Sequence, residues 1–184
     1  MELKGSNTEK NLQAAFAGES QARNKYTYFA DVAKGEGFEE IAGAFLEAAE
    51  NEKVHAKREL ELLQGIGDTE ANVKAAAGGE NHEWTAMYPE FERTAREEGF
   101  TEIADFFKGV ASIEEKHEEM YLSLLRDLQE GKLLKGEKET KWKCRSCGWI
   151  KADFGVPNDC PVCKAPRSSM EAFDSGRDAF SRII

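Results

Sequence analysis

The chain has 184 residues, which suits one domain of ordinary size and a small second one. Charged residues make up 33% of it and the formal net charge is −10, so we expect no nucleic-acid partner, because phosphates attract a basic surface. The apolar runs are too short to span a membrane, and the opening MELKGSNTEK lacks the apolar stretch of a signal peptide. The sequence therefore predicts a soluble, cytoplasmic protein without a membrane partner.

Charge is distributed unevenly along the chain. Residues 1–134 hold 15 Lys and Arg against 28 Asp and Glu, a net of −13, whereas residues 135–184 hold 10 against 7, a net of +3. This shift predicts a first domain at 1–134, a linker at 135–140 and a second domain at 141–184.

The first domain contains an internal repeat. Residues 8–19, TEKNLQAAFAGE, match residues 69–80, TEANVKAAAGGE, at an offset of 61. Residues 37–42, GFEEIA, match residues 99–104, GFTEIA, at an offset of 62. The domain is thus predicted to be a duplicated unit.

Each copy of the repeat reads as a helical hairpin. Apolar residues recur at helical spacing through long segments rich in Ala and Glu, and glycines interrupt the pattern midway. We predict hairpins at 8–64 and 69–134, with Thr8 and Thr69 as N-caps.

Both hairpins carry the same metal-binding residue types. The second helix of each contains Glu-x-x-His, whose two side chains share one helix face, and the first helix contains one further glutamate. One such motif alone is more often a solvated surface pair, but its repetition at equivalent positions favours a metal site. Four carboxylates and two imidazoles form the di-iron or di-manganese ligand set of ferritin-like bundles. The residues are Glu19, Glu52 and His55, then Glu80, Glu114 and His117.

All four cysteines lie in the second domain, as Cys144-x-x-Cys147 and Cys160-x-x-Cys163. Two disulfides are the alternative, but a cytoplasmic compartment keeps thiols reduced. The spacing instead predicts a tetrahedral metal site, which either iron or zinc can fill.

The segments WKCRSCGWI and DCPVCKAP resemble the two metal-binding knuckles of rubredoxin, which favours iron. Gly148 follows Cys147, where a glycine allows a positive φ and lets backbone N–H groups turn toward sulfur. The second knuckle has Lys164 at the equivalent place, at a cost of about 1 kcal/mol. We expect a small aromatic core of Trp142, Trp149, Phe154 and Phe173.

Along its whole length the chain resembles the rubrerythrin family, a ferritin-like di-iron four-helix bundle followed by a rubredoxin-like domain. AFAGESQARNKY, GENHEWTAMYPEF and both Glu-x-x-His segments carry the resemblance. It implies that Tyr26 and Tyr88 lie beside the metals, although both also suit plain helix packing. It implies one iron at the four cysteines and a pair of irons, with manganese or zinc as alternatives, at Glu19, Glu52, His55, Glu80, Glu83, Glu114 and His117.

The resemblance further implies a peroxidase that reduces hydrogen peroxide to water and protects against oxidative stress. A four-thiolate iron centre carries one electron at a time, which explains its attachment to the bundle. Electrons would come from free rubredoxin or from a separate NAD(P)H-dependent reductase. Two alternatives are an iron-oxidising protein of the ferritin type and a non-enzymatic metal-binding module with a zinc ribbon.

Two local irregularities lead to structural predictions. Glu83 has no counterpart in the first copy, where Ala22 stands. We expect Glu83 to bind one iron when the metal site is oxidised and to release it when the site is reduced, with His55 as its replacement.

The spacing after the first-helix glutamate also differs between the copies. Tyr88 lies eight residues after Glu80, whereas the first copy has a spacing of seven. We predict a π-type bulge before Pro89 that absorbs the extra residue.

The connection between the hairpins predicts the assembly. A helix over 38–63 is about 39 Å long, whereas residues 64–68, QGIGD, reach only about 17 Å. The chain therefore cannot return along the helix, as a ferritin-like bundle requires. An up-down-up-down bundle and a late start of the third helix are alternatives. We favour a domain-swapped homodimer, in which each site takes residues from both chains.

Overall fold

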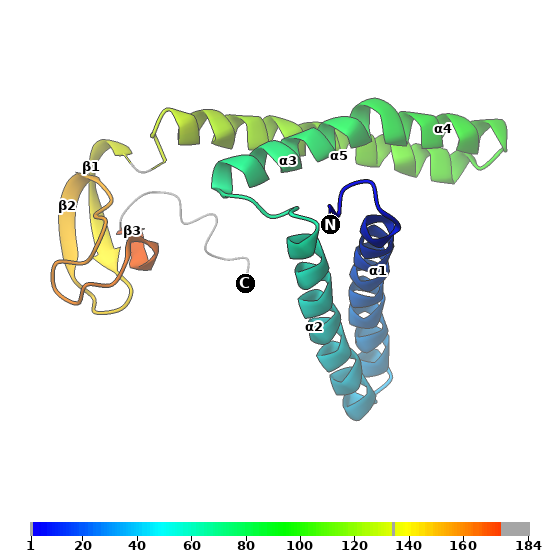
Figure 1. Ribbon diagram of the computed structural model, residues 1–184, viewed down its shortest axis with the longest axis horizontal. Helices are drawn as coiled ribbons and strands as arrows, with labels where there is room; N and C mark the ends of the chain where they lie inside the picture. The colour runs from blue at the N-terminus through cyan, green and yellow to red at the C-terminus, as the bar shows by residue number, and fades with distance from the viewer. Residues whose placement is uncertain (1, 134, 174–184) are drawn as a thin grey trace. The chain divides into compact units, whose positions relative to one another are not determined.

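The computed structural model describes residues 2–133 and 135–173. They divide into two compact units between Asn72 and Val73. The first unit is a helical hairpin, and the second contains a helical hairpin and a small β-sheet (Figure 1). In the described part of the chain, no helix is both long and apolar enough to cross a membrane.

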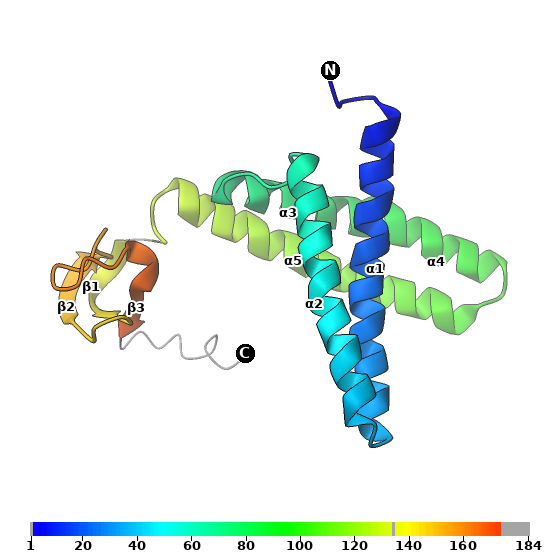
Figure 2. The ribbon, with the colours of Figure 1, turned by 60° about the horizontal axis from the view of Figure 1, so that its bottom comes forward.

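The first hairpin consists of α1 (Asn7–Gly35) and α2 (Glu39–Leu62), which lie side by side (Figure 1 and Figure 2). Small buried residues at the contact allow the two helices to approach closely, and the core cluster there is Ala30, Ala33 and Ala42 with Phe45 packed on it. Gly37 has φ 85° in the turn between the helices, where a glycine is favoured. The predicted hairpin is therefore present.

The second hairpin consists of α3 (Thr69–His82), a π-helix η1 (Glu83–Met87), α4 (Tyr88–Glu97) and α5 (Thr101–Gln129). The π-helix and α4 both pack against α5. The turn before α5 repeats that of the first hairpin, because Gly99 has φ 87°. The repeat in the sequence is thus a repeat of structure.

The predicted N-caps were each placed too late in the sequence. Ser6, not Thr8, caps α1, since its hydroxyl oxygen accepts a hydrogen bond of 3.1 Å from the backbone N–H of Glu9. Asp68 caps α3 by accepting one of 2.8 Å from the N–H of Ala71. Each cap satisfies an otherwise unpaired donor of the first turn, and Thr69 is the first residue of its helix.

The predicted π-type bulge is confirmed. The backbone N–H of Tyr88 donates to the carbonyl of Glu83, five residues earlier, at the end of η1. This is the geometry of a π-turn, which holds one more residue than an α-helical turn. It explains why the repeat offset is 61 up to Glu80 and 62 from Tyr88 onward.

Beyond the π-helix the two hairpins pack alike. The Tyr26, Phe29 and Phe45 rings lie 5.6–6.4 Å apart between centroids. Their equivalents at an offset of 62, Tyr88, Phe91 and Phe107, lie 5.6–6.2 Å apart. The extra residue thus leaves this packing unchanged.

The β-sheet has the antiparallel order β2-β1-β3, with β1 at Lys135–Cys144, β2 at Ile150–Gly155 and β3 at Met170–Phe173. A short 3-10 helix, η2 (Arg167–Ser169), leads into β3. Residues 135–140, expected as a linker, lie in strand β1.

The core of this sheet domain differs from the predicted aromatic cluster. It consists of Cys144, Cys160 and Met170, with Trp149, Val156 and Ala165 packed against them. Phe154 and Phe173 are 63% and 40% exposed, so these two belong to the surface. The first cysteine of each motif therefore lies in the core of this domain, whereas the second is exposed.

Candidate metal centres

The first triad of metal-binding side chains lies between α1 and α2. Glu52 and His55 share one face of α2, and Glu52 Oε2 lies 2.9 Å from His55 Nδ1. Glu19 of α1 faces them, with Oε1 at 3.9 Å from the same nitrogen. One donor atom from each residue falls within 4.8 Å of the others, close enough for one metal ion to touch all three.

The second triad repeats this geometry between α3 and α5. Glu114 Oε2 lies 2.5 Å from His117 Nδ1, and Glu80 Oε2 lies 3.9 Å from it. These three donors also fall within 4.8 Å of one another. The structure thus brings together all six residues that the repeat predicts, as two separate groups of three.

Electrostatics show that both triads favour a cation. A hydrogen bond with Glu52, then burial and the Glu52 charge, raise the pKa of Glu19. Burial, then the charge of Glu114, raises the pKa of Glu80. A divalent ion between the carboxylates would relieve this repulsion, and oxygen donors with one imidazole suit iron or manganese.

Two neighbouring residues lie outside the second triad. Glu83 lies in the π-helix, and its charge contributes to raising the pKa of both Glu80 and Tyr88, which places it near them. It is not among the three donors that meet, so its role as a ligand stays a prediction. His82 is exposed and belongs to none of the donor groups found in the described residues.

The two candidate tyrosines are both half-buried. Burial, then the charges of Glu83, Glu114 and Glu80, raises the pKa of Tyr88. This ring therefore lies close to the second triad and keeps its proton. Tyr26 packs on Phe29 and Phe45, as expected for an aromatic residue between two helices. Its catalytic role stays a prediction.

The four cysteines form a single cluster in the sheet domain. The Sγ atoms of Cys144 and Cys163 lie 3.7 Å apart, and those of Cys147 and Cys160 lie 3.6 Å apart. A disulfide needs about 2.05 Å, so all four thiols are free. Tetrahedral sulfur ligands at 2.3 Å from a metal would be about 3.8 Å apart, which these distances match closely.

Backbone amides stabilise the thiolate form at this cluster. Burial raises the pKa of Cys160, but the N–H groups of Cys163 and Val162 more than offset it and bring that pKa to about 7. The N–H of Trp149 lowers the pKa of Cys147, but burial and the neighbouring thiols together raise it to about 12. Four thiols this close together cannot all ionise, because the thiolates repel one another. A bound metal cation would balance their charge and allow all four to ionise.

The two knuckles share one backbone conformation. Gly148 has φ 78° and Lys164 has φ 60°, and each N–H donates to the carbonyl of the first cysteine in its motif, at 2.8 and 2.9 Å. The left-handed conformation expected at Lys164 is therefore present.

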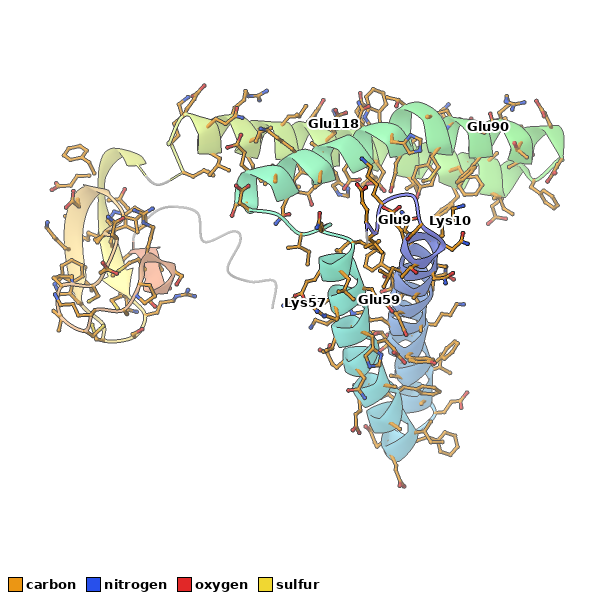
Figure 3. All side chains as sticks on the ribbon, viewed as in Figure 1. Glu9, Lys10, Lys57, Glu59, Glu90 and Glu118 are labelled. Carbon is orange, nitrogen blue, oxygen red and sulfur yellow. The ribbon has the colours of Figure 1, made fainter. Side chains whose placement is uncertain are left out.

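Sequence reasoning missed one group of polar contacts beside the second triad. Glu118 on α5 (Figure 3) accepts hydrogen bonds from the side chains of Asn81 and Trp84, which flank Glu83. The sequence carried one sign of this contact. The two copies of the repeat differ here, because Ala56 of the first copy is equivalent to Glu118 of the second.

Two family models match the chain, one described as Rubrerythrin over residues 10–125 and one described as Rubrerythrin, rubredoxin-like domain over residues 142–171. The chain belongs to the rubrerythrin family. A rubrerythrin of Porphyromonas gingivalis is 48% identical over 182 residues, which cover 92% of this chain and 91% of that protein. One of Nitratidesulfovibrio vulgaris is 47% identical over 182 residues, 92% and 95% of the two chains.

Family membership explains both centres. The fold is mainly helical, with a ferritin-like domain followed by a small rubredoxin-like one, as the sequence predicts. The Glu and His triads supply the donors of a di-iron carboxylate site, and the four cysteines those of an iron centre. The chain is therefore an iron protein of the oxidoreductase type.

Proposed function

We propose that the chain is a peroxidase that reduces hydrogen peroxide to water in the cytoplasm and so protects against oxidative stress. The observation that carries this proposal is the pair of equivalent triads in one chain with a four-cysteine site. Two ferrous ions held by the triads supply the two electrons that cleavage of the O–O bond needs. One peroxide, two electrons and two protons then give two waters.

The protein's own groups position the reaction and move the protons. The carboxylates of the triads would hold the metal ions and neutralise their charge. Tyr88 is the proposed hydrogen-bond donor to the departing oxygen, because its raised pKa keeps the phenol protonated beside Glu80 and Glu114. Tyr26 holds the equivalent position in the other copy.

Glu83 is proposed to make the two metal positions unequal. It lies near Glu80 in a π-turn that the first copy lacks, so only the second triad has a further carboxylate at hand. Glu83 would hold one iron in the oxidised state, and His55 would take its place in the reduced state. Structures of both states check this, and a Glu83 far from the metals in the oxidised state would contradict it.

Electrons reach the site through the four-cysteine centre. A four-thiolate iron carries one electron at a time, so it suits a relay that restores the diferric site in two steps. The donor to this relay is proposed to be a free rubredoxin or an NAD(P)H-dependent reductase on another chain.

The complete site is proposed to form in a domain-swapped homodimer. Helix α2 has 24 residues, about 36 Å, and α3 begins at Thr69, so residues 63–68 reach about 20 Å. That length is too short to return along α2. Each unit carries one triad, so the first triad of one chain would meet Glu83 and the second triad of its partner.

Steady-state turnover separates this function from iron oxidation. The iron-loaded chain is supplied with a reductant and either hydrogen peroxide or oxygen with excess Fe(II). We expect peroxide to be consumed at one molecule per two electrons, and the E114A/H117A variant to lose this turnover. Faster consumption of oxygen with Fe(II) would instead indicate an iron-oxidising protein.

A further inference from the structure

Glu118 joins two segments that are far apart in the sequence. Its Oε1 and Oε2 accept hydrogen bonds of 3.0 and 3.1 Å from Asn81 Nδ2, and Oε2 accepts one of 2.6 Å from Trp84 Nε1. Asn81 lies in the last turn of α3, and Trp84 lies in the π-helix. The carboxylate therefore connects both sides of the residue Glu83 to α5.

The first copy of the repeat has no such connection. Ala56 stands where the second copy has Glu118, and Ser20 stands where it has Asn81. The Ser20 hydroxyl instead donates to the Phe16 carbonyl of its own helix at 2.6 Å. The two copies thus differ in this contact and in the π-turn.

The triads themselves do not need the contact. The distance from the first-helix glutamate to the histidine nitrogen is 3.9 Å in both copies, for Glu19 with His55 and for Glu80 with His117. The first copy reaches this geometry without a glutamate at position 56. The contact thus occurs only in the copy that also has the π-turn with Glu83.

A π-turn is a rare form that needs stabilising contacts, because it departs from the regular hydrogen-bonding pattern of the helix. Hydrogen bonds to an ionised carboxylate are stronger than those between neutral groups. We propose that Glu118 is a positioning residue that holds the π-turn against α5 and thereby presents Glu83 to the second triad. The role of Glu83 as a metal ligand rests on the proposed function. The stabilisation of the π-turn by Glu118 does not.

Hydrogen–deuterium exchange of the metal-free full chain tests directly whether Glu118 stabilises the π-turn. We expect E118A to lower the protection of amides in 83–88 about tenfold or more, as for loss of charge-assisted hydrogen bonds. Peptides covering Glu52–His55 report on the copy that lacks the contact and should be unchanged. The matched control is E119A, which removes an exposed partner of Lys116 on the same helix and should leave 83–88 unchanged.

Exchanging the amide of Asn81 with the carboxylate of Glu118 should restore protection in 83–88. A general loss of stability would not be reversed in this way. N81D places two carboxylates face to face and should lower protection in 83–88 as E118A does. N81D/E118Q restores an amide–carboxylate pair with the roles exchanged, so protection should return. The proposal is overturned if E118A changes protection in 83–88 less than twofold, if it lowers protection equally along all of α5, or if the double variant shows no rescue.

Mössbauer spectra of the ⁵⁷Fe-loaded ferric chain test the presentation of Glu83. Apart from the signal of the four-cysteine iron, we expect two unequal iron environments in the wild type, and E83A and E118A should both make these two more alike. If E83A changes the spectrum and E118A does not, Glu118 does not position Glu83. If E83A itself changes nothing, Glu83 as a ligand is wrong, and the exchange experiment still decides the role of Glu118 at the π-turn.

Discussion

The backbone N–H of Tyr88 donates to the carbonyl of Glu83, five residues earlier, and this one bond marks where the two copies of the repeat diverge. Before it the copies run at an offset of 61, and after it at 62. The rings of Tyr88 and Phe107 nevertheless lie 6.1 Å apart, as those of Tyr26 and Phe45 lie 6.0 Å apart. The extra residue is therefore confined to the turn that carries Glu83.

Deleting Thr85 should convert the π-turn to a regular helix. The spacing from Glu80 to Tyr88 would then match the seven residues of the first copy. We expect the variant to fold and to bind metal at both triads, because the first copy does not need the extra residue, but to lose most of its peroxide turnover as Glu83 is displaced. Circular dichroism, iron content and turnover measure these three properties.

The matched control deletes Lys25, an exposed residue in the regular part of α1 between Glu19 and Tyr26. Here no bulge absorbs the change, so the helix beyond it rotates by about 100°. We expect this deletion to impair folding. Equal stability of the two deletion variants would contradict the view that Thr85 lies in a removable insertion.

Replacing Tyr88 by Phe should lower the rate of peroxide reduction about ten- to a hundredfold, by removing one hydrogen bond to developing charge. Iron content should stay the same. Because the pKa of Tyr88 is raised by burial and then by Glu83, its phenol stays protonated up to and beyond its usual value of about 10. The wild-type rate should thus show no loss from this group at pH 8–10. A Y88F rate equal to the wild type would remove the proposed role.

Lys164 offers a test of backbone conformation at the four-cysteine site. Its φ of 60° costs about 1 kcal/mol relative to glycine, so K164G should stabilise the rubredoxin-like domain by about that amount. Gly148 has φ 78° in the other knuckle, so G148A should destabilise it similarly. The guanidinium midpoint for loss of the ferric-thiolate absorption measures both. A lower midpoint for K164G would show that the lysine side chain contributes more than its backbone costs.

A mixed dimer tests the proposed assembly. One chain carries E52A/H55A and the other carries E114A/H117A. In a swapped dimer one site is complete and the other lacks all four residues, so the isolated mixed dimer should show about half of the wild-type activity. The parents, each dimeric but inactive, are the controls. An inactive mixed dimer would show that each site is built within a single chain.

The sequence was most informative where the repeat constrained it. Two copies of one motif at equivalent positions predicted the six triad residues, and a change of offset between Glu80 and Tyr88 predicted the π-turn. Contacts between distant residues were not predictable in this way. Glu118 reads as one more acid on a charged helix, and only the fold brings it to Asn81, 37 residues away.

Competition between nearby side chains for the same position explains the smaller differences between the predictions and the structure. Ser6 and Asp68 each stand before a predicted N-cap threonine, and the first suitable side chain in the chain became the cap. In the sheet domain, Phe154 and Phe173 were expected in the core because they are aromatic. Cys144, Cys160 and Met170 already fill that small interior, which leaves both rings at the surface.

In the proposed reaction the di-iron site reacts with peroxide, and the four-cysteine iron then supplies electrons to it. Anaerobic stopped-flow mixing of the fully reduced chain with one equivalent of hydrogen peroxide tests this most directly, with the colour of the ferric-thiolate centre as the reporter. We expect the di-iron site to oxidise first, and the ferric-thiolate colour to develop only afterward. The E114A/H117A variant should not show the fast first phase. Immediate development of that colour, at the same rate in the wild type and in this variant, would show that peroxide oxidises the four-cysteine centre directly and that electrons do not pass from it to the di-iron site.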